Sequence, residues 1–185
     1  STTQLAAMVN EYAGNASTLG SDFRSDSYNG IPSTQSETSA LLPQVLKEIY
    51  DALQQKTYNS TIAIQNTSAI ATANVTVSYT NILTTTGNPS VHSGITIPPG
   101  SSVFLNMQNE VSLWPIFFGA ARVTYDQRIA VIVNQNAAGS LTVYRGFTST
   151  NSGQTLIVTQ AVSQIYDSLQ QLNYGTAIEG MVYDG

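Results

Sequence analysis

The sequence predicts an all-β sandwich that carries one or two short helices. Apolar residues alternate with polar ones at the two-residue period of a strand with one wet face. The 185 residues, of which a normal 42% are hydrophobic, suffice to bury a core without cross-links. The chain contains no cysteine, so it can form neither a disulfide nor a thiolate metal site.

Four central stretches show the alternation clearly. Their expected inward positions are Ile62 and Ile64, Val75, Val77 and Tyr79, Ile95 and Ile97, and Val103, Leu105 and Met107. A tight turn is expected at 98–100, because proline cannot donate to a ladder and the glycine that follows admits positive φ. Two further strands, 121–125 and 128–133, are joined by two residues. The second is apolar on both faces and is therefore expected at the centre of a sheet or covered on both sides.

Two segments depart from the strand pattern. From Leu42 through Val45 and Leu46 to Leu53, apolar residues are spaced by three and four, which predicts an amphipathic helix of about three turns. Residues 158–169 repeat this spacing and predict a second short helix. In both segments a strand is expected to pass into the helix, because residues 39–42 and 154–159 favour a strand.

The composition limits the partners of the chain. Charged residues make up only 9% of it and the net charge is −5, so the basic surface that nucleic acid or anionic lipid requires is absent. No apolar run is long enough to span a membrane. Ser and Thr fill 43 positions, a surface chemistry typical of exported proteins, so we expect an extracellular, cell-surface location.

The sequence offers little material for catalysis, and no enzyme activity or cofactor is expected. His92 is the single histidine and is expected on a surface loop. The carboxylates are dispersed. The nearest pair, Asp22 and Asp26 around Arg24, is interpreted as a solvated loop, with a Ca²⁺ site as the alternative, and no metal site is predicted.

Two groups of residues are candidates for modification or contact. Four sequons are candidate glycosylation sites, although this composition yields about three by chance: Asn15, Asn59, Asn66 and Asn74. The bulky run from Trp114 through Phe117 and Phe118 is either a core element or an exposed subunit contact.

An internal repeat is the strongest signal in the sequence. Residues 28–62 align without a gap onto 144–178 at an offset of 116, with 14 of 35 positions identical. Upstream, residues 5–10 resemble 129–134 at an offset of 124, so about eight extra residues lie between Asn10 and Tyr28. The two ends of the chain are therefore the same piece of fold seen twice.

This repeat suggests how the chain assembles. An incomplete sandwich exposes unpaired strand edges, which proteins rarely leave open. We expect an N-terminal arm, 1–27, to donate a strand to a neighbouring copy of the sandwich domain, 28–185. Pairing of the halves within one chain, or a piece of a longer tandem array, are the alternatives. The donated strand would use Leu5, Ala7, Met8 and Val9, and its intrachain equivalent uses Ile129, Val131 and Val133.

Several motifs resemble the tandem immunoglobulin-like β-sandwich repeats of bacterial cell-surface proteins. They are Ser27-Tyr-Asn-Gly-Ile31, Leu41-Leu-Pro43, the segment 58–66, Val75-Thr-Val-Ser-Tyr79, Ile97-Pro-Pro-Gly100 and the segment 129–134. The resemblance spans about 28–147 and implies an immunoglobulin-like, exported, structural or adhesive module without enzymatic activity. At the strand entry, Tyr58 and Tyr174 stand where that family has tryptophan.

The expected function is that of a structural subunit of an extracellular filament, such as a pilus, or of a surface layer. The subunit would form a homopolymer by intermolecular β-strand complementation. The alternative is a carbohydrate-binding or adhesin module that binds glycans.

Overall fold

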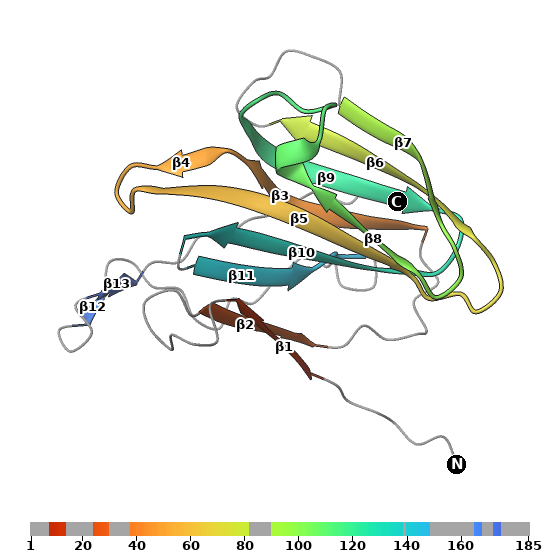
Figure 1. Ribbon diagram of the computed structural model, residues 1–185, viewed down its shortest axis with the longest axis horizontal. Coiled ribbons are helices and arrows are strands. Elements are labelled where there is room, and N and C mark those ends of the chain that lie inside the picture. The colour runs from red at the N-terminus through yellow and green to blue at the C-terminus, as the bar shows by residue number, and fades with distance from the viewer. Residues whose placement is uncertain are drawn as a thin grey trace.

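The computed structural model describes residues 8–13, 24–29, 38–81, 90–138, 140–148, 165–167 and 172–174. Within them, β3 to β11 build two antiparallel sheets that face each other (Figure 1). These strands are β3 (Ser39–Lys47), β4 (Ile49–Asp51), β5 (Lys56–Asn66), β6 (Ala73–Asn81), β7 (Ser90–Ile97), β8 (Ser102–Asn106), β9 (Phe117–Tyr125), β10 (Ile129–Ala137) and β11 (Ser140–Arg145). The predicted all-β sandwich is confirmed, and its immunoglobulin-like refinement stays a prediction.

The two sheets differ in how their strands are ordered. One sheet has the order β3-β9-β6-β7. In the other, β11, β10 and β5 lie side by side, and β4 and β8 pair with successive parts of the far edge of β5. Strand β10 has a neighbour on each side, which confirms its predicted central position.

The core lies between the sheets and is built from the inward-facing half of each strand. Ile62 and Ile64 of β5 have no exposed surface, and Val75, Val77 and Tyr79 of β6 are buried opposite them. Each fully buried aliphatic side chain of this size contributes about 1.5–3 kcal/mol to folding. The alternation predicted from the sequence is therefore the pattern that fills the core.

Several connections cross from one sheet to the other. The turn at 98–101 joins β7 to β8, with Gly100 at φ +68° and Ser101 N–H donating to the Pro98 carbonyl at 3.1 Å. The short 3₁₀ helix η1 (Met107–Asn109) begins the crossing from β8 to β9. The two-residue connection at Asp126 and Gln127 is also such a crossing, because β9 and β10 belong to different sheets.

One side of the sandwich is closed by contacts between the sheets. At Gly146, directly after β11, the chain leaves the side of β10 and reaches β3. There Phe147 and Leu41 exchange two backbone hydrogen bonds of 2.7 and 2.9 Å. A Cβ at Gly146 would lie 3.2–3.3 Å from side-chain carbons on β3 and β10, so a larger residue is disfavoured there. The hydroxyl of Tyr144 and the amide of Gln135 both donate to the Gln44 carbonyl of β3.

The two predicted helices are wrong where the structure describes these segments. Residues 39–47 form β3, and the register against β9 shifts between Leu42 and Val45 around Pro43, so a β-bulge produces the spacing that resembled a helix. Asp51 then accepts hydrogen bonds from the backbone of Leu53 and Gln54 and forms a turn. In the second segment, Ile165–Asp167 is strand β12, and residues 158–164 and 168–169 lie outside the described residues.

Candidate functional site

The N-terminal hairpin repeats the hairpin that ends the sandwich. Strands β1 (Met8–Ala13) and β2 (Arg24–Asn29) pair antiparallel. All six of their pairs become β10–β11 pairs when 124 is added on β1 and 116 on β2, so that Val9 opposite Tyr28 corresponds to Val133 opposite Tyr144. The eight extra residues inferred from the sequence fall in the connection, which is 14–23 here and 138–139 in the second hairpin. The predicted repeat therefore extends to the pairing of the backbone.

The C-terminal hairpin repeats the start of the sandwich in the same way. Strands β12 (Ile165–Asp167) and β13 (Leu172–Tyr174) pair with Ile165 opposite Tyr174 and Asp167 opposite Leu172. Subtracting 116 gives the three pairs that join β4 to β5, beginning with Ile49 opposite Tyr58. The described chain thus contains one sandwich, β3 to β11, flanked by a copy of its last hairpin and a copy of its first.

The two flanking hairpins form separate two-stranded sheets. Pairing of the half-repeats with each other, left open by the sequence, is not seen among the described strands (Figure 1). The predicted boundary after residue 27 falls inside β2, and the unit that precedes the sandwich is the hairpin that ends at Asn29.

The predicted assembly residues occupy contrasting environments. Ile129, Val131 and Val133 on β10 are buried and lie opposite Asn66, Ile64 and Ile62 of β5. Met8 and Val9 lie on β1, whereas Leu5 and Ala7 are outside the described residues. Val9 is 37% exposed, and its equivalent Val133 is fully buried. The lone hairpin therefore leaves uncovered a side chain that the complete sandwich buries.

Strand β2 lies beside the outer edge of β11. There the Asp26 carboxylate accepts a hydrogen bond from the Val143 N–H at 2.5 Å. A carboxylate on an open strand edge blocks the addition of another backbone at that point. Asp26 therefore protects this edge of β11 against the addition of another strand.

The described ranges contain no group of three or more His, Cys, Asp or Glu residues that is suited to a metal ion. Asp22, of the alternative Ca²⁺ site, lies outside them.

The aromatic run separates into a core residue and exposed residues. Phe117 is 1% exposed and packs edge-to-face on Tyr79, with ring centroids 6.1 Å apart. This burial removes Phe117 from the candidate subunit contact. Trp114 is 65% exposed, and Phe118 is partly buried on β9.

The sequons also differ in accessibility. Asn66 is fully buried, and its side-chain amide donates to the carbonyls of Ala71 and Ile97, so its nitrogen is inaccessible in the folded domain. Asn59 is buried, and its side-chain oxygen accepts a hydrogen bond from the Glu48 N–H. Asn74 is exposed, with its amide nitrogen 2.6 Å from a carboxylate oxygen of Asp126. Asn15 lies outside the described residues.

His92 lies on β7, contrary to the predicted loop, and takes part in a polar cluster that sequence reasoning missed. Its Nδ1 is 2.6 Å from Oε2 of Glu110, and Oε1 of Glu110 accepts hydrogen bonds from the backbone and hydroxyl of Ser112. Burial alone would raise the pKa of Glu110, but the hydrogen bonds from Ser112 and His92 outweigh it and lower the pKa below its ordinary value. Lys47 donates to the Glu110 carbonyl at 2.8 Å.

The contacts within this cluster indicate a structural role. The serine bonds to the carboxylate and not to the imidazole, so it lacks the nucleophile-to-base contact of a hydrolytic triad. Its contacts join β3, β7 and the crossing that follows η1. The separation of His92 and Glu110 by 18 residues gave no motif from which sequence reasoning could find the pair.

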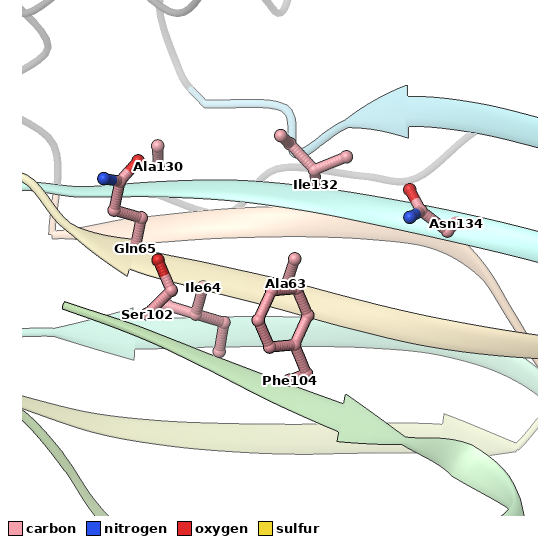
Figure 2. A pocket seen from close by; sticks show the side chains of 8 residues that line it. All are labelled: Ala63, Ile64, Gln65, Ser102, Phe104, Ala130, Ile132 and Asn134. Atoms are coloured by element: carbon pink, nitrogen blue, oxygen red, sulfur yellow. The ribbon is translucent and has the colours of Figure 1, made fainter. Parts of the chain in front are cut away.

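A shallow groove of about 230 Å³ lies on the outer face of the sheet formed by β8, β5 and β10. Figure 2 shows Phe104 on β8 beside Ala63 of β5, with Ile132 and Asn134 along β10. Phe104 is 69% exposed, and the polar lining consists of the side chains of Gln65, Ser102 and Asn134. No charged side chain lines the groove. The sequence indicated an outward-facing Phe104 but not the groove around it.

Comparisons with known proteins bear on the backbone alone. No protein-family model matches the chain, and no curated protein matches it in sequence. The chain is similar to a solved Thermotoga maritima structure, described as Thermotoga maritima 1070, with a TM-score of 0.49 and 13% identity over 62% of this chain and 97% of that chain. A likeness at this level carries no inference about function. Among the described residues, no helix is long and apolar enough to cross a membrane.

Proposed function

We propose that this chain is a structural subunit that joins head-to-tail to further copies by intermolecular β-strand complementation, as in an extracellular filament or surface layer. The observation that carries the proposal is the identity of register between β1–β2 and β10–β11. A hairpin with the same pairing and the same insertion point is suited to the same place on an equivalent sandwich. Two-stranded hairpins are at best marginally stable alone, so both flanking hairpins gain from such a partner.

The composition supports the extracellular part of this proposal. A surface rich in Ser and Thr and poor in charge presents neutral strands to its neighbours. A contact that uses different surfaces on the two copies is heterologous and, where the rotation does not close, extends into a filament.

Electron microscopy and light scattering on the intact chain and on Val9→Asp test this function. Val9 is partly exposed in the single chain, so its replacement is expected to leave the fold of the sandwich intact. On assembly the carboxylate would be buried without a partner, which is strongly unfavourable. We expect filaments from the intact chain, monomers from Val9→Asp, and filaments from the neighbouring control Asn10→Asp. An intact chain that stays monomeric at high concentration would contradict the proposal.

A second candidate function, binding of neutral glycans, is favoured by the groove around Phe104. An exposed aromatic ring packs against the apolar face of a sugar, and the nearby amide and hydroxyl groups match its hydroxyls. Calorimetric titration with neutral gluco-, manno- and chito-oligosaccharides tests this function. Binding that is lost in Phe104→Ala but kept in Val111→Ala, a change at another exposed apolar residue, supports it. Absence of heat with every sugar opposes it.

A further inference from the structure

We propose that Asp26 and Val143 form a fixed joint between the N-terminal hairpin and the sandwich, and that this joint presents the free edge of β1 to a second copy of the chain. In a polymer the joint would set the angle between successive subunits. The inference rests on the proposed function, in which β1–β2 completes the sandwich of another copy. The joint itself lies within one chain, so it can be tested without assembly.

The first step of the argument is the placement of the hairpin. Strand β2 packs against β11, and among the described strands β1 is in extensive contact with β2 alone (Figure 1). Inside the sandwich, the edge of β10 that lies away from β11 pairs with β5. The equivalent edge of β1 lies away from β2 and has no ladder partner among the described strands. The occupant that this edge fits is therefore a strand of a second copy, equivalent to β5.

The second step is the hydrogen bond that holds this placement. Oδ2 of Asp26 accepts from the Val143 N–H at 2.5 Å, and Oδ1 accepts from the Ser27 N–H at 2.7 Å. Both carboxylate oxygens are thus bonded, and the side chain is partly buried. A hydrogen bond to an ionised acceptor is roughly twice as strong as a neutral one. Because it joins β2 to the backbone of a strand in the packed sheet, this bond restrains the hairpin relative to the sandwich.

The third step is a difference between the two copies of the hairpin. Residues 26 and 27 are Asp and Ser, whereas their equivalents in the sandwich are Thr142 and Val143. Ser27 is exposed, but Val143 is only 7% exposed although it lies outside the core cluster between the sheets. Apart from its ladder partner β10, β2 is the described strand packed most extensively against β11. The two copies therefore differ at the contact itself: one has the carboxylate, and the other has the buried valine.

The joint is compatible with assembly. Thr142, the equivalent of Asp26, is exposed, so a completed sandwich does not bury this position. Asp26 can therefore keep its bond to β11 of its own chain while β1 pairs with another copy. Each subunit would then be held at one angle to the sandwich that its hairpin completes. Repetition of a single angle from copy to copy generates a regular helical filament.

Distances between two spin labels test the joint in dilute, monomeric chains. Ser27→Cys on β2 and Ser102→Cys on β8 place the labels at exposed positions, and the chain has no native cysteine. We expect one narrow distance with Asp26 present, and a distribution about twofold wider in Asp26→Ala, because the hairpin loses its charge-assisted bond. Asp26→Asn keeps an acceptor oxygen and should give an intermediate width. The matched control Glu11→Ala removes a carboxylate from β1 and should leave the distribution narrow.

Backbone hydrogen exchange gives a second readout on the same variants. The Val143 N–H should exchange about tenfold faster in Asp26→Ala, because its acceptor is gone. The ladder between β10 and β5 should exchange as in the intact chain, which shows that the sandwich remains folded. Unchanged label distances and an unchanged Val143 exchange rate in Asp26→Ala overturn the joint, whether or not the chain assembles.

Electron microscopy separates the joint from the proposed function. We expect straight, regular filaments from the intact chain and from Glu11→Ala, and filaments of shorter persistence length from Asp26→Ala. An intact chain that stays monomeric overturns the proposed function, and a narrow label distance then supports the joint within the single chain. Filaments of Asp26→Ala that are as straight and regular as those of the intact chain overturn the role of the joint in setting the angle.

Discussion

Asn66 and Tyr79 are both buried in the sandwich, but their polar groups are satisfied to different degrees. Asn66 uses its amide nitrogen and oxygen in three hydrogen bonds that hold the 67–72 connection and the end of β7. The Tyr79 hydroxyl has no hydrogen-bond partner among the described residues. Burial raises the pKa of the Tyr79 phenol and the negative charge of Glu110 raises it further, so the hydroxyl stays protonated and its desolvation is uncompensated.

We therefore expect Tyr79→Phe to raise the free energy of unfolding by about 1 kcal/mol, because it removes a buried group that loses its bond to water. The ring and its packing on Phe117 are retained. Chemical denaturation measures the change. Tyr144→Phe is the matched control and should lower stability by about 1 kcal/mol, since the Tyr144 hydroxyl donates to Gln44. A loss of stability in Tyr79→Phe would show that the hydroxyl has a partner.

The lowered pKa of Glu110 makes an acid-sensitive contribution to stability. A carboxyl whose pKa is lower in the folded than in the unfolded chain stabilises the fold above its ordinary pKa of 4.5 and loses this effect as pH falls below that value. His92, Lys47 and Ser112 contact this residue from β7, β3 and its own crossing. We expect Glu110→Gln to be less stable than the intact chain at pH 7 and nearly equal at pH 3. Urea denaturation across this range tests it, and a constant difference would contradict it.

Strands and their irregularities show what could be predicted at the scale of elements. The strands β5, β6 and β8 were predictable because Ile62, Val77 and Leu105 lie in unbroken alternation. Only the start of β3, residues 39–42, was predicted as strand, and the rest was not, because the bulge at Pro43 converts a period of two into a spacing of three. His92 was expected in a loop because the segment 87–94 is rich in glycine, asparagine, proline and serine. Gly94, at φ +76°, nevertheless belongs to β7, whose register against β6 shifts.

Interactions between sheets were beyond the sequence. Local patterns identify strands but not which sheet each one joins, so the separation of β9 from β10 was not foreseen. The bond from Lys47 to the Glu110 carbonyl links residues 63 apart and has no local signal.

At the crossing, a valine substitution at Gly146 and one at its repeat equivalent, Gly30, are expected to affect different measurements. Gly146→Val should lower the free energy of unfolding by about 2 kcal/mol, because its side chain would press on Ala40, Leu42 and Val131. Gly30→Val, at the equivalent position of the flanking repeat, should leave unfolding of the single chain unchanged and reduce filament yield. Thermal denaturation of the monomer and light scattering of the assembly separate these effects. Equal destabilisation of the monomer by both changes would argue that residue 30 already packs within its own chain.

At the scale of the whole molecule, the structure adds most to the internal repeat that the sequence predicts. Fourteen identities located the equivalent segments, and the strand registers show that they pair alike. The sequence could not show that the central unit is complete, because completeness depends on the sheet to which each strand belongs. Strands β3 to β11 form one sandwich. Among the described strands, the two flanking hairpins lack the neighbouring strands that their equivalents inside the sandwich have.

Backbone hydrogen exchange tests this division of the molecule. In the monomeric Val9→Asp variant, amides in the ladder of β10 and β5 should exchange slowly, because they lie in the packed sandwich. Amides of β1, β2, β12 and β13 should exchange rapidly, since two-stranded hairpins open at little free-energy cost. In filaments of the intact chain the four flanking strands should slow by roughly an order of magnitude or more, while β10 and β5 change little. Equal protection of the flanking strands in monomer and filament would mean that assembly uses another surface, with the exposed Trp114 as the next candidate.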